Sequence, residues 1–275
     1  MPTDLQTHLV LIHPLLRTPL RFILSLACLF PLAASAEPVF SLPVTTFPLG
    51  ELTKRSLKAH SPNLLWARPY ERAHIIPDYD SRILRVTYPA GAIGSRESGA
   101  QMLFGLPPAL SYRLSYEVRF SDSFEWTHGG KLPGLTSGGS TYTGGHRPDG
   151  KGWSARFMWR PEGSLVVYLY DLDIKSHGRD LVVPETQLQR GTWHRLEQRI
   201  DLSPNSPEGR IRVWVDGELC LNRQGLRFRQ PPHGQIDSFY FSTFYGGSTA
   251  RFAPRATQAI DFRKIEITRP GDSRP

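Results

Sequence analysis

The sequence predicts an all-β fold, a single domain built as a β-jelly roll or sandwich of antiparallel strands with a concave groove. Short segments alternate apolar and polar residues with a period of two, which is typical of strands that pack on one face. Turn-forming residues separate these segments, since the 275 residues include 24 glycines and 24 prolines, and no heptads or internal repeats occur. The eight expected strands are Ile83–Tyr88, Tyr112–Phe120, Ser154–Arg160, Leu165–Asp171, His194–Asp201, Arg210–Asp216, Ser238–Phe244 and Ile260–Ile267.

The amino terminus has the pattern of a secretory signal peptide. Phe22–Leu32 is apolar, Arg17 and Arg21 precede it, and small residues follow it. The apolar run is too short to span a membrane comfortably. We therefore expect residues 1–36 to be removed before Glu37, and the mature protein to be secreted or periplasmic without a stable membrane anchor.

Residues 37–275 have a length that suits one all-β domain. Pro38–Pro62 is expected to be a loosely patterned lead-in, and Arg269–Pro275 a frayed tail. Cys28 lies within the signal, in a context that departs from a lipidation motif by one position. Cys220 is then the only cysteine of the mature chain, so no internal disulfide is expected, and its apolar neighbours predict a buried thiol. We expect a monomer.

The chain is basic, with 33 Lys and Arg against 25 Asp and Glu, a net charge of +8 and a pI near 9.7. Loss of the signal removes two arginines and one aspartate, which leaves +7. Such a charge favours polyanions as partners. Nucleic acid is not expected, because no recognition helix, zinc-ligand spacing or RNA-binding signature is visible. An acidic polysaccharide fits the charge equally well and fits an exported protein better.

The segment Gly152–Asp171 predicts a β-hairpin with a polar face. Its loop, Pro161-Glu162-Gly163, ends on a glycine, where the left-handed residue of a bulged hairpin turn belongs. If Arg160 pairs with Ser164, the alternation of side chains sets the register of both strands. Counting back then gives two cross-strand pairs on one face, Arg156 with Tyr168 and Ser154 with Tyr170.

Two interpretations of this polar face are open. Arginine and tyrosine often decorate the solvent side of a sheet, and the spacing by itself favours that interpretation. The second interpretation is a functional site, and Lys131 favours it. Lys131 is the only lysine in a glycine-rich stretch, His128–Gly139, that follows the strand expected at Tyr112–Phe120. A set of lysine, arginine and tyrosine does not suit glycoside hydrolysis, which needs two carboxylates. It suits elimination across a uronic acid.

Six segments, in this order, resemble the polysaccharide lyases of family 14, alginate-lyase-type enzymes with a β-jelly-roll fold. The resemblance runs from about Leu114 to Ile267, more than half of the chain. The segments are GGKLPGL (129–135), GGHRPDGKGWSARFMWR (144–160), LVVYLY (165–170), GTWHRLEQRI (191–200), VWVDGE (213–218) and FSTFYGGS (241–248). The family has a catalytic lysine in its GGK motif, a Ser-x-Arg pair and a Tyr-x-Tyr pair. The resemblance therefore implies the catalytic residues Lys131, Ser154, Arg156, Tyr168 and Tyr170, with no metal and no cofactor.

The expected reaction is β-elimination in a 1,4-linked polyuronate, with alginate as the first substrate and glucuronan as the alternative. Loss of the proton at C5 leaves a carbanion conjugated with the carboxylate, so the site must neutralise that carboxylate. Arg156 can grip it in a fork, and Lys131 can neutralise it or, with a depressed pKa, take the proton. Tyr170 or Tyr168 could be the base instead, because nearby cations favour a phenolate, and the phenol could protonate O4. Ser154 is expected to orient a tyrosine or the sugar.

Further residues are expected near the substrate. Gln101 either faces the cleft or ends a strand, whereas His146 and Arg147 lie in a glycine-rich loop where substrate contact is plausible. Both His128 and His146 could transfer protons, although each also suits a loop hydrogen bond. Trp126 either stacks on a sugar or packs in the core.

Three acidic residues have alternative roles. Asp171 and Asp173 could bind calcium, but two acids at a strand end more often form a solvated turn. Asp216 precedes a glycine, which favours a hairpin turn over a catalytic acid.

The main rival function is a non-catalytic module that binds anionic glycans through the same groove. A hydrolase of similar fold is the second rival, and it lacks the paired carboxylates on one strand.

Overall fold

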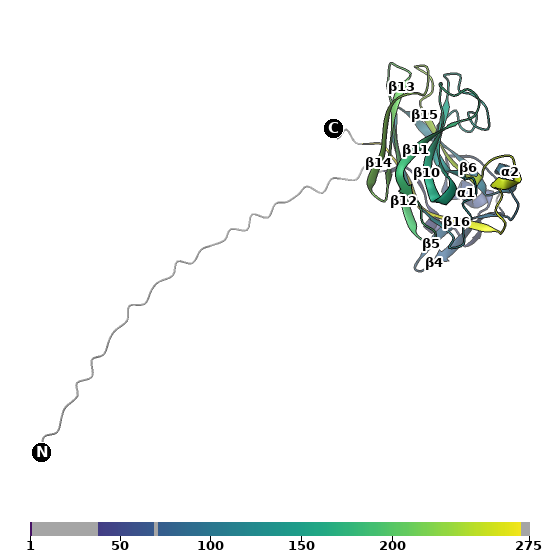
Figure 1. Cartoon of the computed structure of the whole chain (residues 1–275), viewed down its shortest axis with the longest axis vertical. Coiled ribbons are helices and arrows are strands. Elements are labelled where there is room, and N and C mark those ends of the chain that lie inside the picture. The colour runs from purple at the N-terminus through teal and green to yellow at the C-terminus, as the bar shows by residue number, and fades with distance from the viewer. Residues whose placement is uncertain (2–37, 69–70, 271–275) are drawn as a thin grey trace. The chain divides into compact units, whose positions relative to one another are not determined.

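The structure is a computed structural model that describes Met1 and residues 38–68 and 71–270. The expected signal peptide and residues 271–275 of the expected tail lie outside the described residues. The compact unit spans Ala36–Pro275, and its described part holds sixteen strands and two short α-helices, α1 (Lys54–His60) and α2 (Gly94–Glu97) (Figure 1). No helix in the described residues is both long and apolar enough to cross a membrane.

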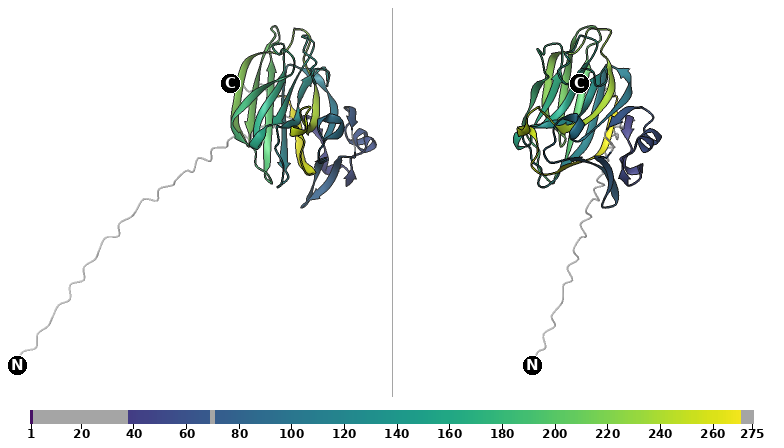
Figure 2. Two further views of the ribbon diagram at one scale, coloured as in Figure 1. Left: turned by 45° about the vertical axis from the view of Figure 1, so that its right-hand side comes forward. Right: turned by 90° about the vertical axis from the view of Figure 1, so that its right-hand side faces the viewer.

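The strands form two antiparallel sheets (Figure 2). The first, here called the cleft sheet, has the order β11 (Arg179–Gln187), β10 (Ser164–Tyr170), β9 (Trp153–Trp159), β8 (Gly130–Ser137), β15 (Ile236–Tyr245), β6 (Ala100–Ala109) and β3 (Leu64–Arg68). The outer sheet has the order β14 (Glu218–Arg227), β13 (Glu208–Val215), β12 (Trp193–Leu202), β7 (Ser111–Phe120), β16 (Gln258–Thr268), β5 (Ser81–Tyr88), β4 (Ala73–Asp78) and β2 (Gly50–Glu51), and β1 (Pro38–Leu42) also pairs with β16. The all-β jelly-roll prediction is confirmed, and each of the eight expected segments is a strand.

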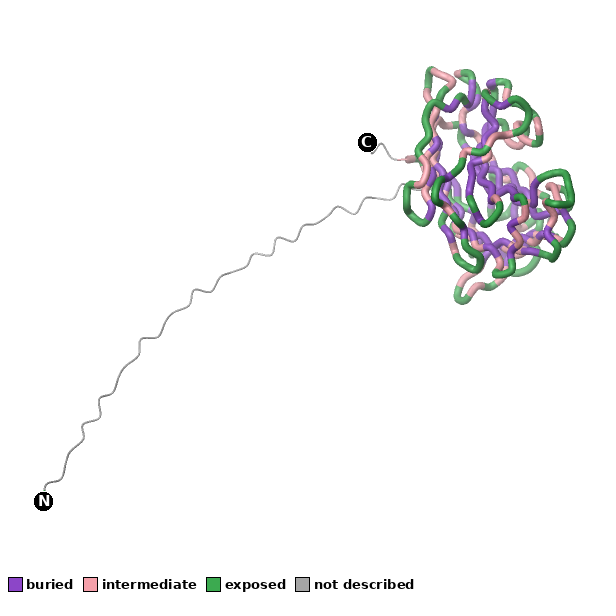
Figure 3. The backbone as a smooth tube through the Cα atoms, in the orientation of Figure 1, coloured by how far each residue is buried: buried purple, intermediate pink, exposed green. Residues whose placement is uncertain are grey.

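The core lies between the two sheets. Strand β7 alternates strictly, with every second side chain buried, as expected for a strand with one face on the core. Aromatic rings meet across the sheets, since Phe241 of β15 and Phe262 of β16 have centroids 4.9 Å apart. Trp159 is fully buried among four other aromatic rings, so its replacement by alanine should cost about 3–5 kcal/mol. Figure 3 shows the buried segments running through the inner strands, with exposed loops around them.

Strand β9 connects the core to the cleft. All seven of its residues are buried, although only alternate ones can face the core. Trp153, Phe157 and Trp159 belong to the core cluster, whereas Arg156 and Met158 point to the other face. The second face is therefore also covered, which indicates a cleft instead of an open sheet surface.

Two expectations about the fold, for Pro38–Pro62 and for Cys220, were wrong, and the stretch around Lys131, which had no expected element, is a strand. Pro38–Pro62 is not a loose lead-in, because it contains β1, β2 and α1, and α1 begins at a capping box formed by Thr53 and Ser56. The glycine-rich stretch around Lys131 is the central strand β8. Cys220 is only half buried, because it lies on the edge strand β14.

Candidate functional site

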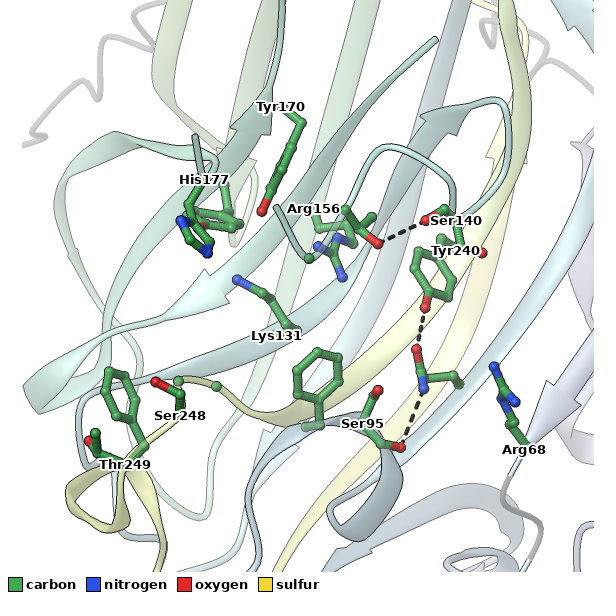
Figure 4. A pocket seen from close by; sticks show the side chains of 18 of the residues that line it. Arg68, Ser95, Lys131, Ser140, Arg156, Tyr170, His177, Tyr240, Ser248 and Thr249 are labelled. Carbon is green, nitrogen blue, oxygen red and sulfur yellow. Dashed lines mark hydrogen bonds between the residues drawn. The ribbon is translucent and has the colours of Figure 1, made fainter. Parts of the chain in front are cut away.

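A cavity of about 610 Å3 opens on the cleft sheet (Figure 4). Among the described residues, its lining includes four cations and no aspartate or glutamate. The cations are Arg68, Lys131, Arg156 and Arg251. Positive charge without an internal counterion makes the cavity suitable for an anionic ligand.

The β9–β10 hairpin has the register expected from the sequence. The Arg160 amide donates to the Ser164 carbonyl at 2.8 Å, and Gly163 has a φ of 82°. Two cross-strand pairs follow, Arg156 with Tyr168 and Ser154 with Tyr170. The geometric prediction for these four residues is confirmed.

The row of paired residues through Arg156 continues across the sheet. Arg156 pairs with Gly134 of β8, and Gly134 pairs with Tyr240 of β15. A Cβ atom at Gly134 would overlap the carbonyl oxygen of Ala155, so only glycine fits there. Because Gly134 has no side chain, the Arg156 guanidinium can lie 5.4 Å from the centroid of the Tyr240 ring.

Lys131 reaches the cavity through a β-bulge. Lys131 pairs with Met158 and Gly134 pairs with Arg156, so three steps on β8 match two steps on β9. A regular strand would turn residues three apart to opposite faces, and the bulge brings both to the cleft. The Lys131 ammonium nitrogen lies 2.6 Å from the Met158 sulfur and 3.4 Å from the centroid of the Tyr168 ring.

The environment of Lys131 favours its neutral form. Burial lowers its pKa well below the ordinary value, and the positive charges of Arg156 and Arg160 lower it further. Asp180 acts in the opposite direction, but it is bound by Arg160 at 2.6 Å. A lysine amine in its neutral form can accept a proton.

Arg156 is a buried cation that keeps hydrogen-bonding capacity. Its side chain donates to Ser242 Oγ at 3.2 Å, and its Nε has no partner. In residues 38–68 and 71–270, no ion pair includes Arg156 or Lys131. Burial lowers the pKa of Arg156, although a guanidinium stays charged in proteins. It can therefore take a carboxylate from a ligand.

The two tyrosines stand against each other beside these cations. Their ring centroids are 5.6 Å apart, and Gly178 packs against both rings. The Tyr170 hydroxyl accepts a hydrogen bond from the Gly145 amide at 3.1 Å. Burial, and then the nearby Tyr170, raise the pKa of Tyr168 despite two arginines. The expectation that cations would favour a Tyr168 phenolate was wrong, because desolvation outweighs them.

The predictions for Ser154 and Gln101 have different outcomes. Ser154 is buried outside the cavity lining, and its hydroxyl donates to the Tyr142 carbonyl at 2.7 Å. It holds the loop that carries Gly145, instead of orienting a tyrosine or sugar as expected. Gln101 does line the cavity, where its side chain accepts a hydrogen bond from Tyr240 and donates one to the Ser95 carbonyl at 3.3 Å.

The expected loop contacts, His146 and Arg147, are not part of the cavity lining, although they follow the lining residues Thr143 and Gly144 in the chain. His146 and Arg147 are exposed residues outside this lining, and His146 Nδ1 lies 3.3 Å from the Thr143 carbonyl. Their contact with a long substrate stays a prediction. His128 also lies outside the lining, with its ring against Phe252. Trp126 packs in the core, with its ring centroid 4.6 Å from that of Phe120.

The acidic residues have structural roles. Asp171 is fully buried and pairs with Arg179 at 2.5 Å, so the expectation of a solvated turn was wrong. Asp173 pairs with Arg227, and the described residues contain no group of three or more His, Cys, Asp or Glu that could hold a metal. Asp216 has a φ of 53° before a left-handed glycine, which confirms the hairpin turn.

The sequence reasoning missed several lining residues. Tyr240 and His177 both face the cavity (Figure 4). Tyr240 was detectable, because alternation in β15 opposes it to the core residues Phe239 and Phe241. His177 lies in the loop after β10, for which the sequence offers no periodic signal.

Comparison with known proteins gives one family and several similar structures. The model of the family described as Polysaccharide lyase 14 matches residues 77–265. No curated protein matches the chain. Alginate lyase Aly36B has 24% identity and a TM-score of 0.73, with coverage of 85% of this chain and 98% of its own. The marine PL-14 alginate lyase from Aplysia kurodai has 24% identity and a TM-score of 0.74, with coverage of 86% and 100%.

A more distant similarity is to the endo-β-1,4-glucuronan lyase of the fungus Trichoderma reesei. It has 11% identity and a TM-score of 0.55, with coverage of 85% of this chain and 96% of its own. At such identities, these structures show a shared fold.

Proposed function

Because this chain belongs to polysaccharide lyase family 14, we propose that it cleaves a 1,4-linked polyuronate by β-elimination, with alginate as the first candidate and glucuronan as the second. The observation that carries the proposal is the composition of the cavity lining, which has three arginines and Lys131 but no carboxylate among the described residues. A polyuronate has one carboxylate per sugar, so it complements this lining. Structural neighbours named as alginate lyases and a glucuronan lyase support the same class of polymer.

Arg156 neutralises the carboxylate of the sugar that loses its proton. Arg156 is 2% exposed, and its guanidinium has no acidic partner among the described residues. Arg156 lines the cavity, so a carboxylate that binds its guanidinium there would gain a charge-assisted hydrogen bond. Neutralising the carboxylate stabilises the carbanion that forms at C5, because that charge spreads into the carboxylate.

Lys131 takes the C5 proton. Its lowered pKa makes the neutral amine available, whereas the raised pKa of Tyr168 keeps that residue a phenol. The electron pair of the broken C5–H bond forms the C4=C5 double bond, and the C4–O4 bond breaks with its electrons on O4. The product is an unsaturated uronate and a new chain end.

Tyr170 supplies the proton that O4 needs. The amide of Gly145 already donates to the Tyr170 oxygen at 3.1 Å, and this hydrogen bond becomes stronger when the tyrosine turns into a phenolate. Lys131 gains one proton and Tyr170 loses one in each turnover. Exchange between these two groups through water returns both to their starting states.

A panel of polyuronates tests the proposal. Wild-type protein should produce ultraviolet absorbance from the unsaturated uronate on alginate or glucuronan. Saturated reducing ends would indicate a hydrolase, which would need a pair of carboxylates that the described lining lacks. Binding of every polyuronate without cleavage would instead favour the binding-module alternative, and either result would overturn the proposal.

A further inference from the structure

The edge strand β3 carries two side chains to the end of the cleft farthest from Tyr170. In its pairing with β6, Leu64 stands opposite Phe104, but Trp66 stands opposite Leu103, so Leu65 is an extra residue in a bulge. Phe104 belongs to the core cluster, and Leu103 does not. The bulge therefore turns Trp66 to the cleft face, and such re-aiming is a known use of bulges beside binding sites.

Arg68 follows Trp66 onto the same face. It pairs with Gln101, and both line the cavity together with Trp66. Its guanidinium carbon lies 5.2 Å from the centroid of the Trp66 ring. The edge of the Trp66 ring in turn meets Tyr240, with centroids 5.8 Å apart, so the wall is continuous as far as Arg156.

Arg68 has no acidic partner among residues 38–68 and 71–270. The outer sheet differs, since Arg85 and Arg119 both bind Asp261 there. An exposed arginine stacked beside an aromatic ring can bind a carboxylate in a fork while the ring covers an apolar surface. A uronate has both of these features, a carboxylate and the apolar face of its sugar ring.

The position of this pair relative to the proposed reaction centre follows from the strand order. Four strand spacings separate β3 from β9, which carries Arg156. At about 4.8 Å per spacing the backbones of the two strands lie about 19 Å apart. Their side chains approach each other more closely, but the Tyr240 ring lies between Trp66 and the Arg156 guanidinium. In Figure 4, Arg68 lies beyond Tyr240 as seen from Lys131.

We propose that Trp66 and Arg68 form a distal subsite that binds a uronate other than the one that loses its proton. Arg68 pairs with the carboxylate of that unit, and Trp66 packs against its ring. The polymer therefore lies across the strands of the cleft sheet, from β10 towards β3. This inference rests on the proposed polyuronate lyase function, and the subsite lies outside residues 77–265, the segment that matches the family model.

Kinetics on a ladder of uronate oligosaccharides and on polymer test the subsite. With wild-type protein, kcat/KM should rise with chain length until the substrate reaches β3. Trp66→Ala should raise KM for long substrates about tenfold, and Arg68→Ala about threefold to fivefold because Arg68 is exposed to water. The effect of Arg68→Ala should shrink at high salt. On substrates too short to span the cleft, both variants should lose much less of the wild-type kcat/KM than on long substrates.

The matched control is Arg223→Ala, an exposed arginine of β14 in the outer sheet, which removes the same charge and should leave all parameters unchanged. Equal KM values for wild type, Trp66→Ala and Arg68→Ala on long substrates would overturn the subsite. So would an equal loss on the shortest substrates, since that would indicate a structural role. Absence of cleavage by the wild type would overturn the proposed function instead. Oligosaccharide affinities of Trp66→Ala and Arg68→Ala, measured by calorimetry against wild type, would then decide the subsite.

Discussion

Replacing Lys131 by methionine should make the protein more stable and nearly inactive. Lys131 is 9% exposed, and its ammonium group contacts a sulfur and an aromatic ring, with no acidic partner among the described residues. Methionine fills a similar volume without a polar group to bury. Stability and activity should therefore change in opposite directions, as is common where a site contains a strained polar group.

The size of the gain follows from this environment. A buried polar group without a good hydrogen-bond partner costs about 1–3 kcal/mol. We therefore expect Lys131→Met to add about 2 kcal/mol to the free energy of unfolding, or about 4–8 °C in Tm for a domain of this size. Activity should fall by about two to four orders of magnitude, because proton transfer is lost.

The gain should depend on pH with a defined sign. The pKa of Lys131 is lowered in the folded protein, so the unfolded chain binds more protons between that value and the ordinary lysine pKa. Wild-type stability should therefore rise with pH across this window, whereas the methionine variant lacks this titration. The difference in Tm should be largest below the folded pKa and shrink as the pH rises.

Differential scanning calorimetry over a pH series measures the effect, with Lys264→Met as the control. Lys264 is 67% exposed and pairs with Glu117 at 2.8 Å, so its replacement should lower stability by less than about 1 kcal/mol. A lower Tm for Lys131→Met, or activity above a tenth of wild type, would refute the reasoning about burial and proton transfer.

Four further outcomes are expected. Tyr170→Phe keeps the ring and should lower kcat about 100-fold or more with a Tm close to wild type, and a near-normal rate of absorbance increase would exclude it as the acid. Gly134→Ala should push Arg156 away and lower kcat as well as raise KM, because Arg156 stabilises the carbanion, and steady-state kinetics would measure both. The kcat/KM of the wild type should rise with pH, and the midpoint of this rise should lie well below the ordinary lysine pKa. Lys131→Arg should lack this rise, because arginine does not lose its proton. Amino-terminal sequencing of exported protein should begin near Glu37, and recovery of only full-length protein in the cytosol would contradict the signal peptide.

The sequence by itself determined the hairpin that carries Arg156, Tyr168 and Tyr170. The register of this hairpin depends only on residues that are close together in the chain. These are the three-residue loop that ends in glycine and the strictly alternating residues on both sides of it, and the structure has the register that they predict. The same local information identified all eight expected strands. It also indicated the basic charge that suits an acidic polymer.

The sequence and its family resemblance named Lys131 and Gln101 beside the hairpin, but only the tertiary structure decided how these side chains reach it and added Tyr240 and Trp66. Lys131 and Trp66 face the cleft because of bulges, and a bulge is a mismatch between two strands, so one strand's sequence does not reveal it. Tyr240 and Gln101 reach the same wall from β15 and β6, which are far from β9 in the chain.

The protonation states were also decided by packing. Nearby cations alone would favour a tyrosinate at Tyr168, but burial raises the pKa of this tyrosine. An ordinary lysine would be charged and would suit a neutralising role, but burial lowers the pKa of Lys131. Burial depends on every segment that covers a group, and those segments come from distant parts of the chain. A local pattern can therefore name the chemical groups of the site, whereas their mutual distances and their desolvation, which decide the direction of proton transfer, arise only when the sheets assemble.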